Sequence, residues 1–197
     1  MLRFRILHRG TVSLLKEAQG AALLEFAIVL PLLVVFVVGI FDFSGAFNQK
    51  QKIEQAAQEG AIIAGAQPMS DIESGNGDPD SLHPVVTAVF NSLAGSGVLT
   101  KGTCVPPGTA VHVGSSSNLK WRYTISSCPD DLVVVIDRGW VSTSGTSTSI
   151  TAAVGTTVKV TYPYRWRFNS VIQLLFPGAG YAAITNLTES ATVHNQM

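Results

Sequence analysis

The sequence predicts an α+β protein in which a long N-terminal helix is followed by a small domain with an antiparallel sheet. Three observations support this fold class: an apolar run at residues 21–41, a helix-like segment rich in small residues that ends before Pro68, and alternating strand patterns in the second half of the chain. The 197 residues are 46% hydrophobic and only 13% charged, whereas about 25% of a typical soluble domain is charged. We therefore expect three parts, at residues 1–20, 21–66 and 67–197.

The apolar run has the length and composition of a transmembrane helix. Residues 21–41 carry one charge, Glu25, and as a helix they would be about 31 Å long, which matches one hydrocarbon thickness. Four basic residues precede the run, against the single acid Glu17, and only Lys50 and Lys52 follow it soon afterwards. Because cytoplasmic flanks carry the excess of Lys and Arg, this pattern places the N-terminus in the cytoplasm and the bulk of the chain outside.

Two features inside the expected helix bear on its packing. Pro31 has no N–H and deprives the carbonyl of Ala27 of its partner, so a kink is expected at this level. Ala56, Gly60 and Ala64 recur every four residues, and such a stripe of small residues lets another backbone approach closely. The stripe fits contacts with neighbouring subunits and packing against the chain's own domain equally well, and both alternatives stay open.

The start of the span differs from an ordinary secretory signal. Such a signal has a short apolar core followed by a small-residue cleavage site, whereas the small residue here, Gly20, precedes the apolar run. The basic leader, Gly20, Ala21 and Glu25 resemble the class III signal of type IV pilin-like proteins in residue type and spacing. More narrowly, the segment GAALLEFAIVLPLL at residues 20–33 resembles the TadE-like family of the tight-adherence (Flp-type) pilus system, and the resemblance covers about residues 15–66.

The resemblance implies a processing step and a subunit contact. A prepilin peptidase would cut between Gly20 and Ala21, removing the leader and leaving the helix at the new N-terminus. A carboxylate at mid-bilayer costs about 2.5–3.5 kcal/mol, so we expect Glu25 to pair with the amino terminus of its own or a neighbouring subunit. The alternative is a glutamate at the membrane interface that marks the helix start. The implied partners are this peptidase, other pilin-like subunits and inner-membrane pilus assembly proteins.

The exported part is expected to hold one short helix and several strands, behind a polar linker at residues 69–80. The helix is expected at residues 84–94. The strand patterns lie at residues 109–113, 119–126, 131–137, 156–168 and 182–193. Residues 141–151 are expected to form a Ser/Thr/Gly loop or a sheet edge. The apolar stretch within residues 171–180 is expected to be a buried connector, with docking on a membrane or partner as its alternative.

The two cysteines indicate a disulfide. Cys104 and Cys128 both fall in the exported part, where an oxidising compartment favours a bond between them. A metal site is the alternative, but two cysteines without nearby histidines do not complete one. The sequence has no catalytic motif, no phosphate-binding loop and too few clustered basic residues for a nucleic-acid track. We therefore expect no enzyme activity, no metal, no cofactor and no nucleic-acid partner.

These observations give a leading hypothesis and two alternatives. The first is a non-enzymatic minor pseudopilin that takes part in assembly of a tight-adherence pilus. Its helix would lie in the bacterial inner membrane or be drawn into the pilus, and residues 67–197 would lie in the periplasm. The second is an uncleaved, membrane-anchored periplasmic protein that binds a partner. The third is an exported enzyme tethered by the same helix.

Overall fold

The structure is a computed structural model that describes residues 10–72, 77–99, 104–115, 118–146, 149–167, 173 and 184–196, with side chains from Gly20 onward and outside residues 142–153. The chain divides into two compact units. The first consists of Met1–Phe43 with Arg167–Tyr181, and the second of Ser44–Trp166 with Ala182–Met197. Helix α1 (Gly10–Ala66) contributes its first part to one unit and its last part to the other.

The first unit contains the predicted apolar helix. α1 runs without interruption through Pro31. From Gly20 onward it is the one helix, among the residues that the structure describes, that is long and apolar enough to cross a membrane, judged by length and composition. This confirms the long N-terminal apolar helix predicted from residues 21–41. Residues 171–180 lie outside the described part of the chain apart from Gln173, so the connector expected there stays a prediction.

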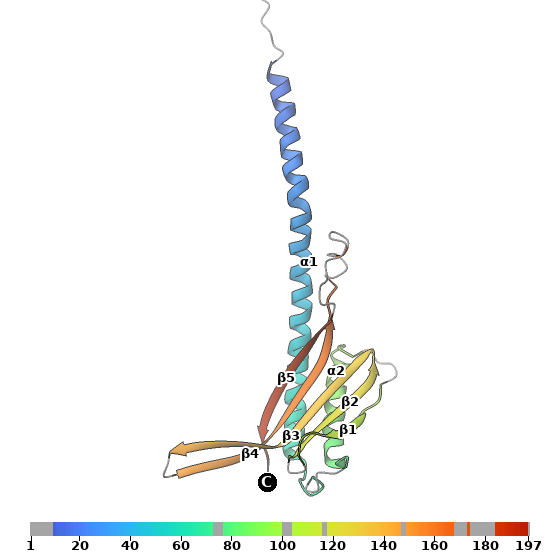
Figure 1. Cartoon of the computed structure of the whole chain (residues 1–197), viewed down its shortest axis with the longest axis vertical. Helices are drawn as coiled ribbons and strands as arrows, with labels where there is room; N and C mark the ends of the chain where they lie inside the picture. The colour runs from blue at the N-terminus through green and yellow to red at the C-terminus, as the bar shows by residue number, and fades with distance from the viewer. Residues whose placement is uncertain are drawn as a thin grey trace, which may run out of the picture. The chain divides into compact units, whose positions relative to one another are not determined.

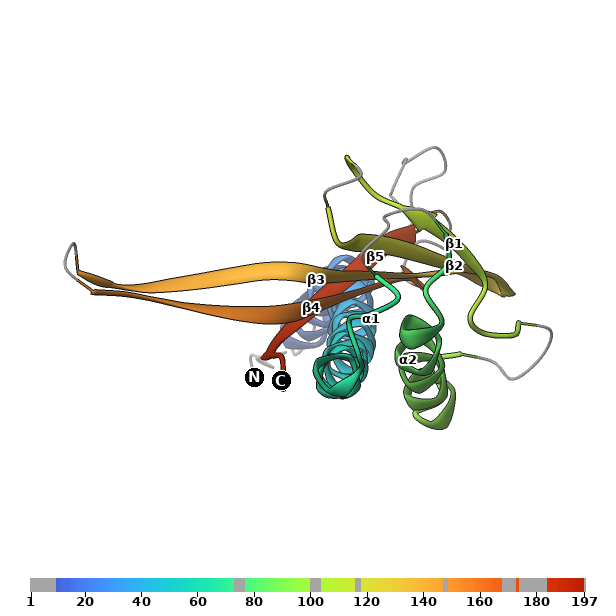
Figure 2. The same cartoon turned by 90° about the horizontal axis from the view of Figure 1, so that it is seen from below.

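The second unit is a five-stranded antiparallel sheet with two helices on one face (Figure 1, Figure 2). The strands follow one another in the order β1-β2-β3-β4-β5, so each pairs with its neighbour in the chain and the sheet is a meander. The strands are β1 (Thr109–His112), β2 (Lys120–Cys128), β3 (Asp130–Thr146), β4 (Ser149–Arg165) and β5 (Ile184–His194). The helices are the last part of α1 and α2 (His83–Gly95), which follows the short 3₁₀ helix η1 (Asp80–Leu82). The predicted α+β fold is confirmed.

The core lies between the helices and the sheet, and strand alternation explains which residues enter it. On β2, Trp121 and Tyr123 are buried while Arg122 between them is exposed. On β4, Val158 and Val160 are buried in the same way. The helices supply Ile53, Ala56, Ala57, Ala61 and Ala64 from α1, and Val85, Val86, Val89 and Leu93 from α2.

The ladder between β3 and β4 is longer than the ladders on either side of it. The β2–β3 pairing ends at Lys120 and Asp137, and the β4–β5 pairing ends at Gly155 and His194. β3 and β4 stay paired beyond these points as far as Thr146 and Ser149. Figure 1 and Figure 2 both show the hairpin extending past the rest of the sheet. Residues 140–146 and 149–155 are called the β3–β4 arm below.

Of the two alternatives for residues 141–151, the loop is wrong. The described residues of this segment are strand, and β4 begins at Ser149 rather than at residue 156. Ser, Thr and Gly favoured a loop in the sequence, but the segment also holds Val141, Thr143 and Ile150, whose branched side chains favour extended backbone. Cross-strand pairing then satisfies the backbone groups of each strand that face the other, which a loop would have left to water.

Candidate functional site

The predicted processing junction lies on an exposed part of α1. Gly20, Ala21 and Glu25 all belong to this helix, and all three are exposed. The space around Gly20 is open, because a Cβ built there would have no neighbouring heavy atom within 4 Å. Glu25 lies about 7.5 Å farther along the helix axis. The glycine, the alanine and the carboxylate are therefore all accessible to another molecule along one continuous helix.

Beyond Glu25, α1 exposes a long apolar surface. Leu23 is 70% exposed and Phe41 is 75% exposed. The other large apolar side chains exposed on the helix up to Phe43 are Leu24, Phe26, Ile28, Val29, Leu30, Leu32, Leu33, Val34, Phe36, Val37, Ile40 and Phe43. A contiguous apolar surface of this kind is typical of membrane or protein contact, so α1 could serve as a membrane anchor. Pro31 lies on the same exposed stretch, and the kink predicted there stays a prediction.

The small-residue stripe of α1 lies in the core of the second unit. Ala56 and Ala64 are 0% exposed, and Gly60 between them is buried. A Cβ at Gly60 would lie 2.6 Å from Cγ2 of Val89 on α2 and 3.3 Å from Cγ1 of Val158 on β4. The missing side chain therefore lets α1 approach α2 and β4 closely. Within the described residues, the stripe packs against the chain's own domain, which is one of the two alternatives that the sequence left open.

Arg138 on β3 binds the C-terminal end of α1. It is 0% exposed, and its Nη1 and Nη2 donate hydrogen bonds to the carbonyls of Ala64 and Gln67. Its Nε lies 3.1 Å from Sδ of Met69. Burial lowers the pKa of Arg138, and the charge of Asp71 opposes this effect. A guanidinium stays protonated in proteins, so a positive charge lies at the negative end of the helix.

Sequence reasoning missed Arg138, although a signal for it existed. Leu132, Val134 and Ile136 alternate as the buried residues of β3, and Arg138 is the next residue in the same phase. A charged residue in the buried phase of a strand needs a partner of opposite charge or several carbonyls. Its partners lie far away in the chain, at the end of a helix. The sequence therefore indicated a charged residue in a buried position without indicating which groups bind it.

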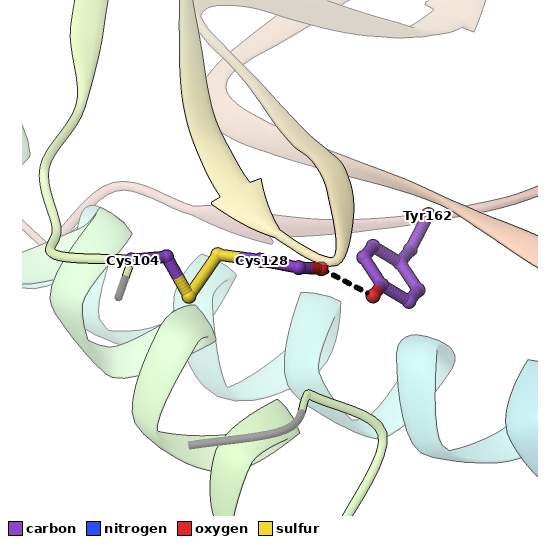
Figure 3. Close-up of a disulfide and its surroundings, with 3 residues drawn as sticks. All are labelled: Cys104, Cys128 and Tyr162. Atoms are coloured by element: carbon purple, nitrogen blue, oxygen red, sulfur yellow. Dashed lines mark hydrogen bonds between the residues drawn. A yellow bond between two sulfur atoms is a disulfide. The ribbon is translucent and has the colours of Figure 1, made fainter. Parts of the chain in front are cut away.

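The predicted disulfide is present. Cys104 and Cys128 are bonded, with their Cα atoms 5.0 Å apart, and the bond ties the segment before β1 to the end of β2. Figure 3 shows the bond beside Tyr162, whose Oη donates a 2.6 Å hydrogen bond to the Cys128 carbonyl. Burial raises the pKa of Tyr162, so this hydroxyl stays protonated and can donate throughout the physiological range. The disulfide and Tyr162 together hold the connection between β2 and β3 against β4.

The acidic linker before α2 is held on the sheet by hydrogen bonds. Tyr123 Oη donates to Asp78 Oδ1 at 2.7 Å, and His83 Nε2 lies 2.9 Å from the same oxygen. Burial and the Asp78 hydrogen bond raise the pKa of Tyr123. Nearby, the Ser81 N–H donates to Asp71 Oδ2 at 2.8 Å. Within the described ranges, no group of three or more His, Cys, Asp or Glu side chains could hold a metal ion.

A comparison with protein families finds a match to part of α1. A family model described as TadE-like protein matches residues 20–61. The comparison with curated proteins and the comparison with solved structures each found no match. The matched segment starts at Gly20, includes Glu25, Pro31 and Gly60, and ends before any strand of the sheet. The resemblance seen in the sequence is confirmed, and residues 20–61 of this chain are a TadE-like segment.

Proposed function

We propose that this protein is a minor pseudopilin that takes part in assembly of a tight-adherence pilus. The observation that carries the proposal is the TadE-like match at residues 20–61, which begins at the glycine that ends the basic leader and covers the apolar helix. The family is that of the tight-adherence pilus system, so pilin-like subunits are plausible partners. The helix anchors the chain in the bacterial inner membrane, and the second unit lies in the periplasm.

The proposed first step is removal of the leader by a prepilin peptidase after Gly20. Exposure of Gly20 and Ala21 on α1 supports access to the peptide bond between them. The cut leaves Ala21 with a free α-amino group, whose ordinary pKa of about 8 makes it largely cationic at neutral pH. This cation then pairs with Glu25 of its own or a neighbouring subunit and offsets the cost of a carboxylate in lipid.

The second unit has a structural, non-enzymatic role in this proposal. Support comes from its polar groups, which are engaged in holding the fold: Arg138 on the end of α1, Tyr123 on Asp78, and Tyr162 on the Cys128 carbonyl. The disulfide adds a covalent tie suited to an oxidising compartment. In this proposal, these contacts stabilise the unit that follows the apolar helix in the chain.

The intact mass of the full-length gene product tests the proposal. In cells with a prepilin peptidase, we expect a mature chain that starts at Ala21, and in cells without it, a chain that keeps the leader. Gly20→Leu should block the cut, whereas Gly39→Leu is the matched control, because the space around Gly39 is equally open. A leader that persists in peptidase-containing cells would contradict the proposal and favour an uncleaved anchor that binds a periplasmic partner.

A second measurement addresses assembly. Pili sheared from cells that lack the gene should be fewer than pili from cells complemented with the unaltered chain. Complementation with Gly20→Leu should fail and complementation with Gly39→Leu should succeed. Equal pilus yield with and without the gene would remove the assembly role even if the leader were cut.

A further inference from the structure

The β3–β4 arm has strand edges that no other described strand covers. On the β3 side, the last hydrogen bond from the arm's base to the β2 side is from the Arg138 N–H to the Leu119 carbonyl at 2.7 Å. On the β4 side, the Asn195 N–H donates to the Val154 carbonyl at 3.1 Å, and the described pairing with β5 ends there. A two-stranded hairpin is marginally stable alone in water, and free edges are templates for pairing with another chain.

The arm carries no charge. No Asp, Glu, Lys, Arg or Pro occurs between Arg138 and Lys159. Proteins that keep an edge strand unpaired usually place lysine, inward-pointing charge or proline on it. By contrast, β2 carries Lys120 and Arg122, and the first part of β3 carries three aspartates. The arm lacks every one of these devices and is rich in Thr, Ser, Val and Ala.

The register of the arm fixes which residues of its two strands share a face. Every second residue of a strand shares a face, and cross-strand partners share it too. The pairs on one face are Val141–Val154, Thr143–Ala152 and Gly145–Ile150, and the pairs on the other are Trp140–Gly155, Ser142–Ala153, Ser144–Thr151 and Thr146–Ser149. At the base of the arm, Val141 is 54% exposed and Val154 is 37% exposed. The arm therefore starts on an exposed apolar pair.

A cavity lies beside β3 at the level where β2 begins. Its volume is about 470 Å³. It is lined by Met69, Asn118, Leu119, Lys120, Asp137, Arg138, Gly139, Val141 and Val154. A strand added to the free edge of β3 would lie beside residues 140–146, in line with β2. Its end would reach this cavity. At the same level, the segment after β5 lies against the β4 edge, where the Asn195 N–H donates to the Val154 carbonyl.

We propose that the β3–β4 arms of two copies of this chain pair edge to edge, β3 against β3 in antiparallel orientation, to form one four-stranded sheet. A second copy supplies a free edge of the same length, and pairing two uncharged segments brings no like charges together. Two-fold pairing is isologous, so the tip of each arm lies at the base of the other, beside the cavity. This association does not depend on cleavage after Gly20.

Cysteine cross-linking of the purified full-length chain in detergent tests the pairing. Single cysteines are introduced in turn along residues 140–146 of β3, with the Cys104–Cys128 disulfide kept. Because the two-fold axis would pass near the middle of the arm, Thr143→Cys should give the highest yield of disulfide-linked dimer, at least several-fold above Trp140→Cys. Ser190→Cys on the exposed part of β5 is the matched control for random collision. Yields equal to that of Ser190→Cys at every position would overturn the proposal.

A charge variant gives an independent readout. Thr143→Lys places two ammonium groups across the two-fold axis, so the dimer dissociation constant measured by analytical ultracentrifugation in detergent should rise tenfold or more. Asn91→Lys adds the same charge at an exposed position of α2 and should leave dimerisation unchanged. Equal dimerisation of the two variants, or arm cysteines that cross-link in cells only to a different protein, would refute pairing between copies. Because all variants keep the same apolar helix, association through that helix affects them equally.

Discussion

Arg138 on β3 donates a hydrogen bond to the carbonyl of Ala64 in the last turn of α1. A second bond, 2.8 Å long, runs from Nη2 to the carbonyl of Gln67. The last carbonyls of a helix have no partner within it and carry partial negative charge, so one guanidinium supplies both the donors and the opposite charge. The Gln196 N–H adds a 3.0 Å bond to the Gly65 carbonyl. The sheet thus holds the C-terminal end of the helix that contains the TadE-like segment.

Arg138→Met should lower the free energy of unfolding of the second unit by about 2–4 kcal/mol. The substitution keeps most of the apolar volume but removes the hydrogen bonds from Arg138 to the carbonyls of Ala64 and Gln67. Hydrogen bonds to charged groups contribute about 1.5–3 kcal/mol each. Urea unfolding of the full chain in detergent, followed by tryptophan fluorescence, measures the change. Arg122→Met on the exposed phase of β2 is the matched control and should change stability by less than about 0.5 kcal/mol. Equal effects of the two substitutions would contradict the role of Arg138.

Gly60→Ala should destabilise the second unit by about 1–2 kcal/mol. Alanine favours a helix over glycine by about 1 kcal/mol, but its Cβ would lie 2.6 Å from Val89 Cγ2, and overpacking costs about 1–3 kcal/mol or more. Val89 cannot easily turn away, because valine strongly prefers one rotamer in a helix. The same urea titration measures the change.

Two further variants separate the clash from other effects of alanine at Gly60. Gly95→Ala, at the end of α2, has no heavy atom within 4 Å of the new Cβ and should be neutral or stabilising. In the Val89→Ala background, Gly60→Ala should cost less than in the unaltered chain, because the clashing methyl group is gone. A loss that persists undiminished in that background would show that contact with Val89 is not its cause.

Much of the second unit could be predicted from sequence because its information is local. The alternation of Trp121 and Tyr123, and of Val158 and Val160, marks strands with one buried face, and each strand pairs with its neighbour in the chain. The junction at Gly20 and Glu25 is likewise a spacing along a single helix. Both features can be predicted from residues that are close together in the sequence, without knowing which distant residues contact them.

What the sequence did not predict depends on pairing or on distant partners. The arm is rich in Ser and Thr with few large apolar residues, so only the ladder between β3 and β4 distinguishes it from a loop. Arg138 and Ala64 are joined across the fold, and so are Tyr123 and Asp78. Polar contacts of this kind leave no periodic signal, since one donor and one acceptor suffice.

Reduction of the Cys104–Cys128 bond should destabilise the second unit by about 3–4 kcal/mol. The loop-entropy model assigns this value to a closed segment of this length, because the bond restricts the unfolded chain. Cys128 is 0% exposed, so replacing it would also disturb its packing. Measuring the free energy of unfolding of the unaltered chain with and without dithiothreitol therefore separates the effect of the bond from that of packing. A Cys104→Ser/Cys128→Ser variant serves as the control, since its stability should not respond to the reductant.

The Asp130–Arg165 pair should make stability depend on acid pH. Arg165 donates through Nε and Nη2 at 2.9 and 2.5 Å, and these hydrogen bonds hold the pKa of Asp130 below its ordinary value. The pair's contribution is therefore complete above the unfolded pKa of about 3.9 and is lost as pH falls through the lower folded value. Asp130→Asn should lower Tm at pH 6, with the difference shrinking below about pH 4. Asp131→Asn, on an exposed neighbour, should lack this pH-dependent difference.

Glu25→Ala should leave cleavage intact and impair assembly. In the proposed function, the peptidase acts at Gly20 and Ala21, whereas Glu25 pairs with the new amino terminus in lipid. Without Glu25, the cationic amino terminus has no charge partner in lipid, and this should cost more than about 1.4 kcal/mol. The assembled fraction should therefore fall about tenfold or more. Intact mass reports cleavage, and the yield of sheared pili reports assembly. Glu59→Ala, on an exposed part of the same helix, should retain both. Normal pilus yield with Glu25→Ala would show that Glu25 merely marks the start of the span.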